Sequence, residues 1–299
     1  MPPRVTALLD KAVEAVERAE FLDPVAGAVG KVIAKIAPTG PVKDTLSGTW
    51  LGHPVHPLLV AVPIGSWVGA SWLDLVGGFG GRAAATRLVG LGNLAAVPTA
   101  LTGASDWVDT EGAERRVGLV HATLNYASIG VYVGSWLARR HGNHGRGVAL
   151  ALLGAGVISA SGYLGGHLAY AQGVGVDTTA FTQLPQDWAD AAAEGDVVEG
   201  RAVLGDADGV PVLLVRRAGV VLALADRCTH RGGPLHEGTL EDGCVVCPWH
   251  ASRFALEGGA VDRGPATRPQ PSFQTRVVAG RVQVRHVDER ALRTNPVGT

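Results

Sequence analysis

The chain has 299 residues, which is long enough for two domains. Its 26 Lys and Arg residues balance 27 Asp and Glu residues, so the strong positive field of nucleic-acid-binding proteins is excluded. Charged residues make up only 18% of the chain and the mean hydropathy is positive, so we expect part of the chain to lie in lipid. All three cysteines lie between Cys228 and Cys247, which excludes a disulfide framework.

Residues 1–48 predict an N-terminal segment of two amphipathic helices. Lys31 and Lys35 on the polar side of the second helix allow it to lie on a membrane surface, and packing against the rest of the protein is the alternative. The segment lacks the apolar core of a secretory signal and a twin-arginine pair. The predicted apolar faces are Val5, Leu8, Leu9, Val13 and Val16 in the first helix, and Val25, Val29, Val32, Ile33 and Ile36 in the second.

Residues 49–172 contain four apolar stretches, which predict a four-helix transmembrane domain. They are roughly residues 58–79, 83–104, 117–137 and 148–170. Each has about 22 residues, enough to cross a hydrocarbon core of about 30 Å. Gly65 and Gly69, like Gly162 and Gly166, have the spacing that allows helices to approach closely in lipid.

The motif GHPVHP (Gly52–Pro57) precedes the first of these stretches. Residues 48–175 resemble a family of uncharacterised four-helix bacterial membrane proteins that carries a G-H-P-x-H-P motif. The resemblance implies a multi-pass protein of the bacterial cytoplasmic membrane, and it brings no activity with it.

Four histidines are expected at one membrane face: His53 and His56 where the first helix begins, His121 early in the third, and His167 near the end of the fourth. Histidines in membrane segments are costly and often functional. A haem b held by two of them is one interpretation, with His121 and His167 as the first choice and His56 next. A non-haem metal, a quinone pocket, or hydrated histidines without a ligand are the alternatives.

Glycine, threonine and proline after residue 172 predict a linker over residues 173–186. Short β-rich runs separated by the turn signals DADG and RAG then predict a small all-β domain over residues 187–288, followed by a tail, 289–299. The fold class is therefore α+β with two domains: a four-helix transmembrane bundle and a small β-domain.

The β-domain carries a cysteine–histidine pattern that points to a metal centre. Cys228 and His230 form C-x-H, and Cys247 and His250 form C-x-x-H after sixteen intervening residues. Two thiolates and two imidazoles suit tetrahedral zinc or a two-iron cluster with histidines on one iron. A redox dithiol of Cys244 and Cys247 would leave the other three residues without a role.

These residues resemble the Rieske iron–sulfur proteins over about residues 187–287. CTHRGGPL (228–235) and CPWHASRF (247–254) match the two cluster-binding loops, and GPATRPQP (264–271) matches the proline loop. The resemblance implies that Cys228 and Cys247 hold one iron of a [2Fe-2S] cluster and that His230 and His250 hold the other. Cys244 then becomes a small buried strand residue.

The chain departs from the Rieske proteins of cytochrome bc complexes. The positions of their inter-loop disulfide correspond to Gly233 and Trp249, and a tyrosine that donates to the cluster corresponds to Phe254, while Ser252 keeps a hydroxyl. Fewer donors stabilise the reduced cluster less, so we expect a low potential, about −150 mV. The absence of a disulfide also favours a cytoplasmic Rieske domain.

The sequence therefore predicts a membrane-bound electron-transfer protein, a component of an oxidoreductase system rather than a stand-alone enzyme. Its Rieske cluster would exchange electrons with a haem b or a quinone at the adjacent membrane face. The alternative is a ferredoxin for which the bundle is only an anchor. The implied partners are membrane lipid, a reductase or an oxidase or oxygenase, and quinone; nucleic acid is excluded.

Overall fold

The computed structural model describes residues 4–286 and divides into two compact units. The helical unit contains the chain up to residue 38 and residues 54–175. The β unit contains residues 39–53 and the chain from residue 176 onward. The domain boundaries inferred from the sequence stay predictions, and the tail at 289–299 lies outside the described residues.

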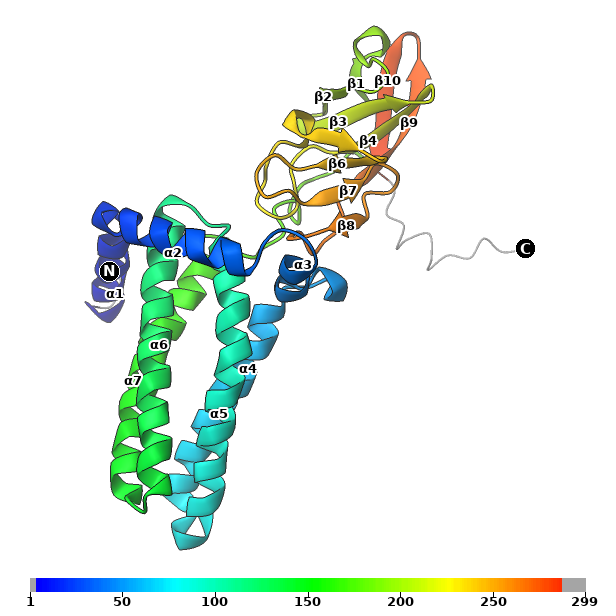
Figure 1. Ribbon diagram of the computed structural model, residues 1–299. Helices are drawn as coiled ribbons and strands as arrows, with labels where there is room; N and C mark the ends of the chain where they lie inside the picture. The colour runs from blue at the N-terminus through cyan, green and yellow to red at the C-terminus, as the bar shows by residue number, and fades with distance from the viewer. Residues whose placement is uncertain (1–3, 287–299) are drawn as a thin grey trace. The chain divides into compact units, whose positions relative to one another are not determined.

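The helical unit contains four long helices that run up and down side by side (Figure 1). Three of them, α4, α5 and α7, are long and apolar enough to cross a membrane. The remaining one, α6, is equally long but carries more charged and polar residues, so its crossing stays a prediction. The helices of this unit are α1 (Arg4–Glu17), η1 (Glu20–Leu22), α2 (Asp23–Ile36), α4 (Val55–Val76), α5 (Gly78–Trp107), α6 (Gly112–Arg140) and α7 (His144–Tyr170).

The long helices bury many small side chains and expose many large apolar ones. The buried set includes Ala70, Ala85, Gly92, Ala96, Ser128, Ala151, Gly154 and Ser161. The exposed set includes Leu58, Val68, Trp72, Leu75, Leu94 and Leu152. Small residues allow helix backbones to approach closely in lipid. Large apolar side chains such as leucine can face outward, because lipid tails are as apolar as they are. This distribution is typical of a membrane bundle.

The hairpin α4–α5 is repeated by the hairpin α6–α7. IGSWVG (64–69) recurs as IGVYVG (129–134), 65 positions later. The rings of Trp67 and Tyr132, equivalent residues of the two repeats, stack with centroids 4.1 Å apart and planes 5° apart. Each ring lies against an equivalent glycine, Gly92 for Trp67 and Gly154 for Tyr132, where a Cβ would collide with it. Equivalent residues therefore meet between the hairpins.

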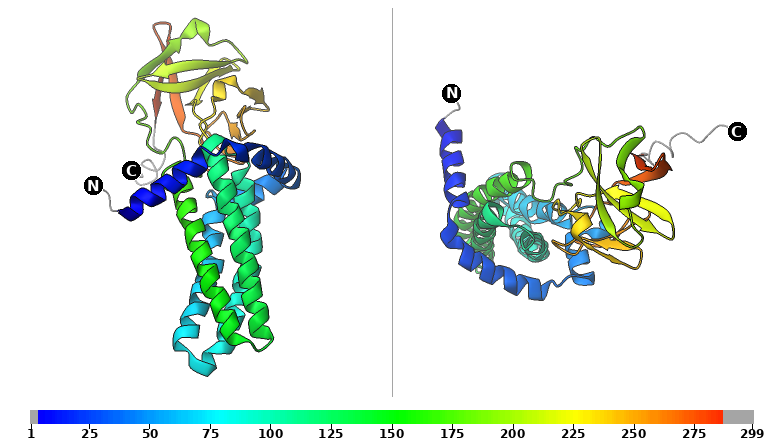
Figure 2. Two further views of the ribbon diagram at one scale, coloured as in Figure 1. Left: turned by 90° about the vertical axis from the view of Figure 1, so that its left-hand side faces the viewer. Right: turned by 90° about the horizontal axis from the view of Figure 1, so that it is seen from above.

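Helices α1 and α2 lie across one end of the bundle (Figure 2). Val13 of α1 is buried with Val117 and Leu164, so the first helix packs on the bundle. The second helix leaves its apolar face open, because Val25, Val29, Val32 and Ile36 are all exposed. The two predicted N-terminal helices are thus present. The first packs its apolar face on the bundle, and the second leaves its apolar face exposed.

Arg116 of α6 holds the start of α2 through Asp23. The Nε and Nη2 atoms of Arg116 donate to the two carboxylate oxygens of Asp23 over 2.7 and 2.8 Å. This hydrogen-bonded guanidinium lowers the pKa of Asp23 below its ordinary value of 3.8. A lowered folded-state pKa stabilises the fold above the unfolded value and loses that contribution as pH falls through the folded value.

We therefore expect wild type to be more stable than Asp23→Asn at about pH 6, and the two to converge below pH 3.8, the ordinary pKa. Thermal unfolding of both proteins across this range would measure the difference. A difference between them that is independent of pH would contradict the role of this ion pair.

The β unit is built from two antiparallel sheets (Figure 1). The six-stranded sheet has the order β1-β10-β9-β4-β3-β2 and the four-stranded sheet β5-β6-β7-β8. The strands are β1 (Ala189–Ala193), β2 (Ala202–Ala207), β3 (Val210–Arg217), β4 (Val220–Ala225), β5 (Thr239–Glu241), β6 (Cys244–Val246), β7 (Arg253–Ala255), β8 (Val261–Arg263), β9 (Ser272–Val278) and β10 (Arg281–His286). Short 3-10 turns occur at η3 (Glu194–Asp196) and η4 (Leu235–Glu237).

The same unit includes a short helical segment that precedes α4 in the chain. It consists of α3 (Pro41–Ser47) and the 3-10 turn η2 (Thr49–Leu51). The sequence did not predict this element, because seven residues are too few to show a helical period.

Candidate metal centre

The first cysteine–histidine loop follows β4. The Cys228 N–H donates to the Gly233 carbonyl over 2.9 Å, and the Gly232 N–H donates to the Cys228 carbonyl over 2.8 Å. Gly232 has a φ of 79°, a left-handed conformation that glycine adopts without strain. This tight turn presents Cys228 and His230 from the same loop.

The second loop joins β6 to β7. The Cys247 N–H donates to the Ser252 carbonyl over 2.8 Å, and the Ala251 N–H donates to the Cys247 carbonyl over 3.1 Å. The Ser252 hydroxyl oxygen accepts the N–H of Ala266 over 3.0 Å, which ties this loop to the proline loop.

The two cysteines lie side by side in the core between the sheets. Their exposed fractions are 1% for Cys228 and 3% for Cys247, and their thiols are hydrogen-bonded to each other. That hydrogen bond, together with burial, raises the pKa of Cys228 well above its ordinary value, and it lowers the pKa of Cys247 to about 7. Backbone N–H groups also donate to each sulfur, those of His230 and Arg231 to Cys228 and those of Trp249 and His250 to Cys247. Converging sulfurs surrounded by donors suit a negatively charged sulfur cluster.

The two histidines form a second pair. The rings of His230 and His250 have centroids 5.0 Å apart and are nearly perpendicular, at 89°. Burial lowers the pKa of His230 well below its ordinary value, so its imidazole is neutral, the form that binds metal. Within residues 4–286, no three His, Cys, Asp or Glu side chains gather as a single metal ion would require. A pair of thiols and a pair of imidazoles match the ligands of a two-iron cluster that has histidines on one iron.

Gly233 allows the two loops to approach. A Cβ at this position would lie 2.9 Å from the Cys247 sulfur and 3.0 Å from the Trp249 ring. Any larger residue would therefore push into the sulfur site. Positions 233 and 249 face each other as the resemblance implies, and with glycine and tryptophan there they form no disulfide.

Gln270 of the proline loop was missed in the sequence, although its place between two prolines in PQP marks it. Its amide nitrogen donates to the carbonyls of Ala225 and Arg227 over 2.7 and 2.6 Å. Its amide oxygen accepts the Thr229 N–H over 3.1 Å. The buried side chain thus holds the first loop in place.

Cys244 lies in β6, opposite Ala255 of β7, and is buried. This is the packing position that the sequence predicts for the third cysteine.

Known proteins match the two parts of the chain separately. The Rieske [2Fe-2S] domain family matches residues 187–274, and the family described as predicted membrane protein (DUF2231) matches residues 52–178. The anthranilate 1,2-dioxygenase ferredoxin subunit of Burkholderia cepacia is 32% identical over 98 residues, 33% of this chain and 91% of that protein. The chain belongs to the Rieske [2Fe-2S] family.

Other proteins match the same part of the chain. The 3-phenylpropionate/cinnamic acid dioxygenase ferredoxin subunit of Escherichia coli K12 is 38% identical over 86 residues, 28% of this chain and 80% of that protein. Human apoptosis-inducing factor 3 is 34% identical over 103 residues, 34% of this chain and 17% of that protein. A solved complex of reduced oxygenase and oxidized ferredoxin in carbazole 1,9a-dioxygenase contains a chain with 29% identity and a TM-score of 0.32, covering 34% of this chain and 98% of that one.

In the helical unit, the repeat makes His56 and His121 equivalent. The Nδ1 atom of His56 is 3.0 Å from the Thr99 carbonyl, and that of His121 is 2.8 Å from the Ser161 carbonyl. Each ring lies against an equivalent glycine, Gly103 for His56 and Gly165 for His121. The two imidazoles are close enough to interact electrostatically.

These contacts determine the tautomer of both rings. A carbonyl oxygen only accepts, so Nδ1 carries the proton in each histidine and Nε2 presents a lone pair. The Asn125 amide donates to Nε2 of His121 over 3.0 Å. A histidine that binds a metal through Nε2 commonly donates its Nδ1–H to a backbone carbonyl or another acceptor, which fixes the orientation of the ring.

The other two candidate histidines differ. Nε2 of His167 lies 3.0 Å from a carboxylate oxygen of Glu17 in α1, whereas Nε2 of His121 faces the Asn125 amide. His53 is exposed and belongs to residues 39–53 of the β unit. The repeat thus relates His121 to His56, while the pairing of His121 with His167 as ligands stays a prediction.

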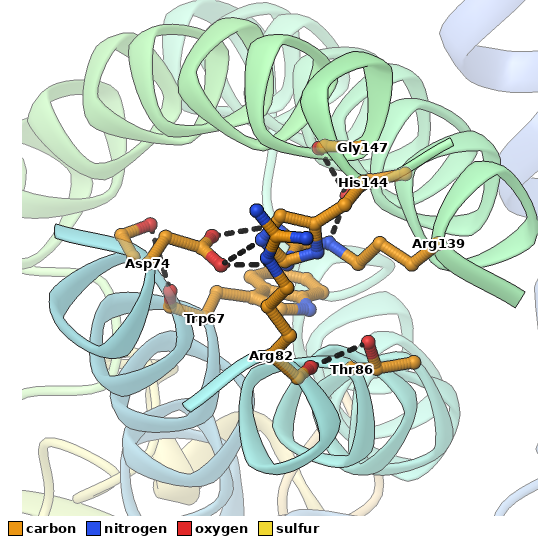
Figure 3. Close-up of polar contacts among 9 residues, drawn as sticks. Trp67, Asp74, Arg82, Thr86, Arg139, His144 and Gly147 are labelled. Carbon is orange, nitrogen blue, oxygen red and sulfur yellow. Dashed lines mark hydrogen bonds and ion pairs between the residues drawn. The ribbon is translucent and has the colours of Figure 1, made fainter. Parts of the chain in front are cut away.

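The helical unit also contains a buried polar cluster that the sequence reading missed (Figure 3). Arg139 of α6 donates through Nη1 and Nη2 to the two carboxylate oxygens of Asp74 of α4, over 2.8 and 2.5 Å. His144 of α7 lies 3.3 Å from the same carboxylate. Asp74 and Arg139 are again 65 positions apart, so this ion pair also joins equivalent positions of the two repeats.

Proposed function

We propose that the chain is a membrane-bound electron-transfer protein in which Cys228 and Cys247 hold one iron of a Rieske cluster and His230 and His250 hold the other. The observation that carries this is the convergence of two buried thiols and two imidazoles from opposite loops. The cluster, when bound, supplies transfer of one electron at a time. The protein contributes the donors around the sulfurs and the loops that hold the ligands.

We further propose that α4–α7 all cross the membrane and that the exposed apolar face of α2 lies on its surface. We also propose that the Rieske domain lies in the cytoplasm, because Gly233 and Trp249 exclude the inter-loop disulfide of an oxidising compartment. Protease accessibility in intact cells would test this orientation: cleavage of the Rieske domain from outside would overturn it.

Within the helical unit, we propose that His56 and His121 form the site of a redox partner, a haem b or a quinone. The equivalent positions of His56 and His121 in the two repeats support this, and a ligand at His121 would replace the Asn125 amide at Nε2. A haem would be held through the Nε2 atoms of His56 and His121 and would supply one-electron transfer, whereas a quinol would donate its hydroxyl protons to the same two nitrogens.

A reduced-minus-oxidised visible spectrum of the detergent-purified protein, with a pyridine haemochrome assay, tests this. Haem adds sharp bands to the broad absorption of the cluster. We expect His56→Ala and His121→Ala to abolish the sharp bands, and His167→Ala to keep them. If the ligand is a quinone, the wild-type spectrum has no sharp bands. Solvent extraction should then recover quinone from the wild-type protein but not from His56→Ala or His121→Ala.

A second candidate is a ferredoxin that delivers electrons to a separate oxygenase or other partner enzyme, with the bundle as an anchor only. The dioxygenase ferredoxin subunits among the relatives favour it. A protein with an intact cluster, without haem or quinone, and with spectra unchanged in His56→Ala and His121→Ala would support this candidate against the first.

A further inference from the structure

A segment outside the region of Rieske similarity packs on the proline loop within the β unit. The Gly264 N–H donates to the Asp44 carboxylate over 2.9 Å, and the Thr49 hydroxyl donates to the Ala266 carbonyl over 3.1 Å. A Cβ at Gly264 would collide with the Thr49 hydroxyl, so the two segments fit closely. Arg268 reaches the Gly52 carbonyl over 3.5 Å. Residues 39–53 therefore pack as part of the β unit.

This segment brings a lysine into the domain. Lys43 of α3 has an exposed fraction of 4%, and its charge acts on the imidazole of His230. Lysine is almost never buried to this extent, because an ammonium loses its hydration on burial. The same burial removes the water that would screen its charge from its surroundings. Asp44, the next residue, has the opposite charge to Lys43, and its carboxylate binds the same proline loop.

We propose that Lys43 raises the reduction potential of the Rieske cluster and that Asp44 lowers it. On reduction the oxidised cluster gains one electron from a donor, such as dithionite, and its charge becomes more negative by one. A fixed positive charge beside a histidine ligand stabilises that reduced form more than the oxidised form. A fixed negative charge does the opposite. The segment before the first membrane helix thus adjusts the electron-transfer site, and this inference rests on the ligand assignment proposed above.

The test is a redox titration of the full-length protein in detergent, followed by the electron paramagnetic resonance signal of the reduced cluster. Lys43→Met keeps the length and packing of the side chain but removes its charge. We expect its equilibrium constant for reduction to fall about tenfold, which is about 59 mV for a one-electron couple. Lys43→Arg keeps the charge and should stay close to wild type. Asp44→Asn keeps an oxygen that accepts the Gly264 N–H, and it should shift the potential upward.

Arg281→Gln is the matched control, because it removes a positive charge from an exposed pair with Asp190 in the same domain. It should leave the potential unchanged. An unchanged potential in Lys43→Met overturns the inference. A shift of Lys43→Met and Asp44→Asn in the same direction also overturns it, since loosening of the segment would explain both. If Lys43→Met fails to assemble a cluster, the Asp44→Asn variant decides the test. An upward shift of its potential supports the inference, and a downward shift or none overturns it. A wild-type protein without the cluster signal would instead refute the proposed function.

Discussion

Replacing either Cys228 or Cys247 by alanine is expected to abolish the [2Fe-2S] cluster, while the same replacement of Cys244 leaves it intact. Removal of one thiolate leaves an iron with a single protein ligand in a buried site, where water cannot take its place readily. All three cysteines are buried, so the three variants create similar cavities. A difference between them therefore reports ligation rather than packing.

Iron and acid-labile sulfide analysis, with the visible and electron paramagnetic resonance spectra, would measure this. Cys244→Ala should keep the wild-type cluster content at a stability cost of about 1 kcal/mol. His230→Ala and His250→Ala should lose the cluster as well, because they remove the ligands of the second iron. Loss of the cluster in Cys244→Ala, together with its retention in Cys228→Ala, would refute the ligand set proposed here.

The largest effect on stability is expected from breaking the buried ion pair of the helical unit. The side chains of Arg139 and Asp74 have exposed fractions of 0% and 4%. Arg139→Met leaves the buried Asp74 carboxylate without its guanidinium partner and with His144 as its neighbour, and we expect it to destabilise the helical unit by about 3–5 kcal/mol. Replacing both, as Asp74→Leu with Arg139→Met, should recover most of that loss, because no charge is then left buried.

Thermal unfolding in detergent, followed by circular dichroism, would compare these variants. Arg18→Met is the matched control, since Arg18 pairs with Glu14 in α1 at the surface, with exposed fractions of 81% and 55%. Its cost should be about 0.5 kcal/mol or less. Equal costs for Arg139→Met and Arg18→Met would show that the buried pair does not hold the two hairpins together.

Local patterns determined much of this protein. Apolar runs of about 22 residues predict helices because helix length follows from hydrophobic thickness, and all four predicted long helices are present. The Rieske motifs place all four expected ligands on two loops, because a short loop with glycines at fixed positions takes a backbone conformation set by its own sequence. The repeat of IGSWVG in IGVYVG is also a feature of the sequence alone.

Only the tertiary structure decided which of these residues meet. Nothing near Asp74 in the chain indicates that Arg139 neutralises it, and nothing near Lys43 indicates that its charge acts on His230. The match of His121 with His56 likewise depends on how two hairpins face each other. Such contacts join residues far apart in sequence, and packing and burial select them after the helices and strands have formed. The local sequence therefore specifies the elements and the ligands, while the fold specifies the charges around them.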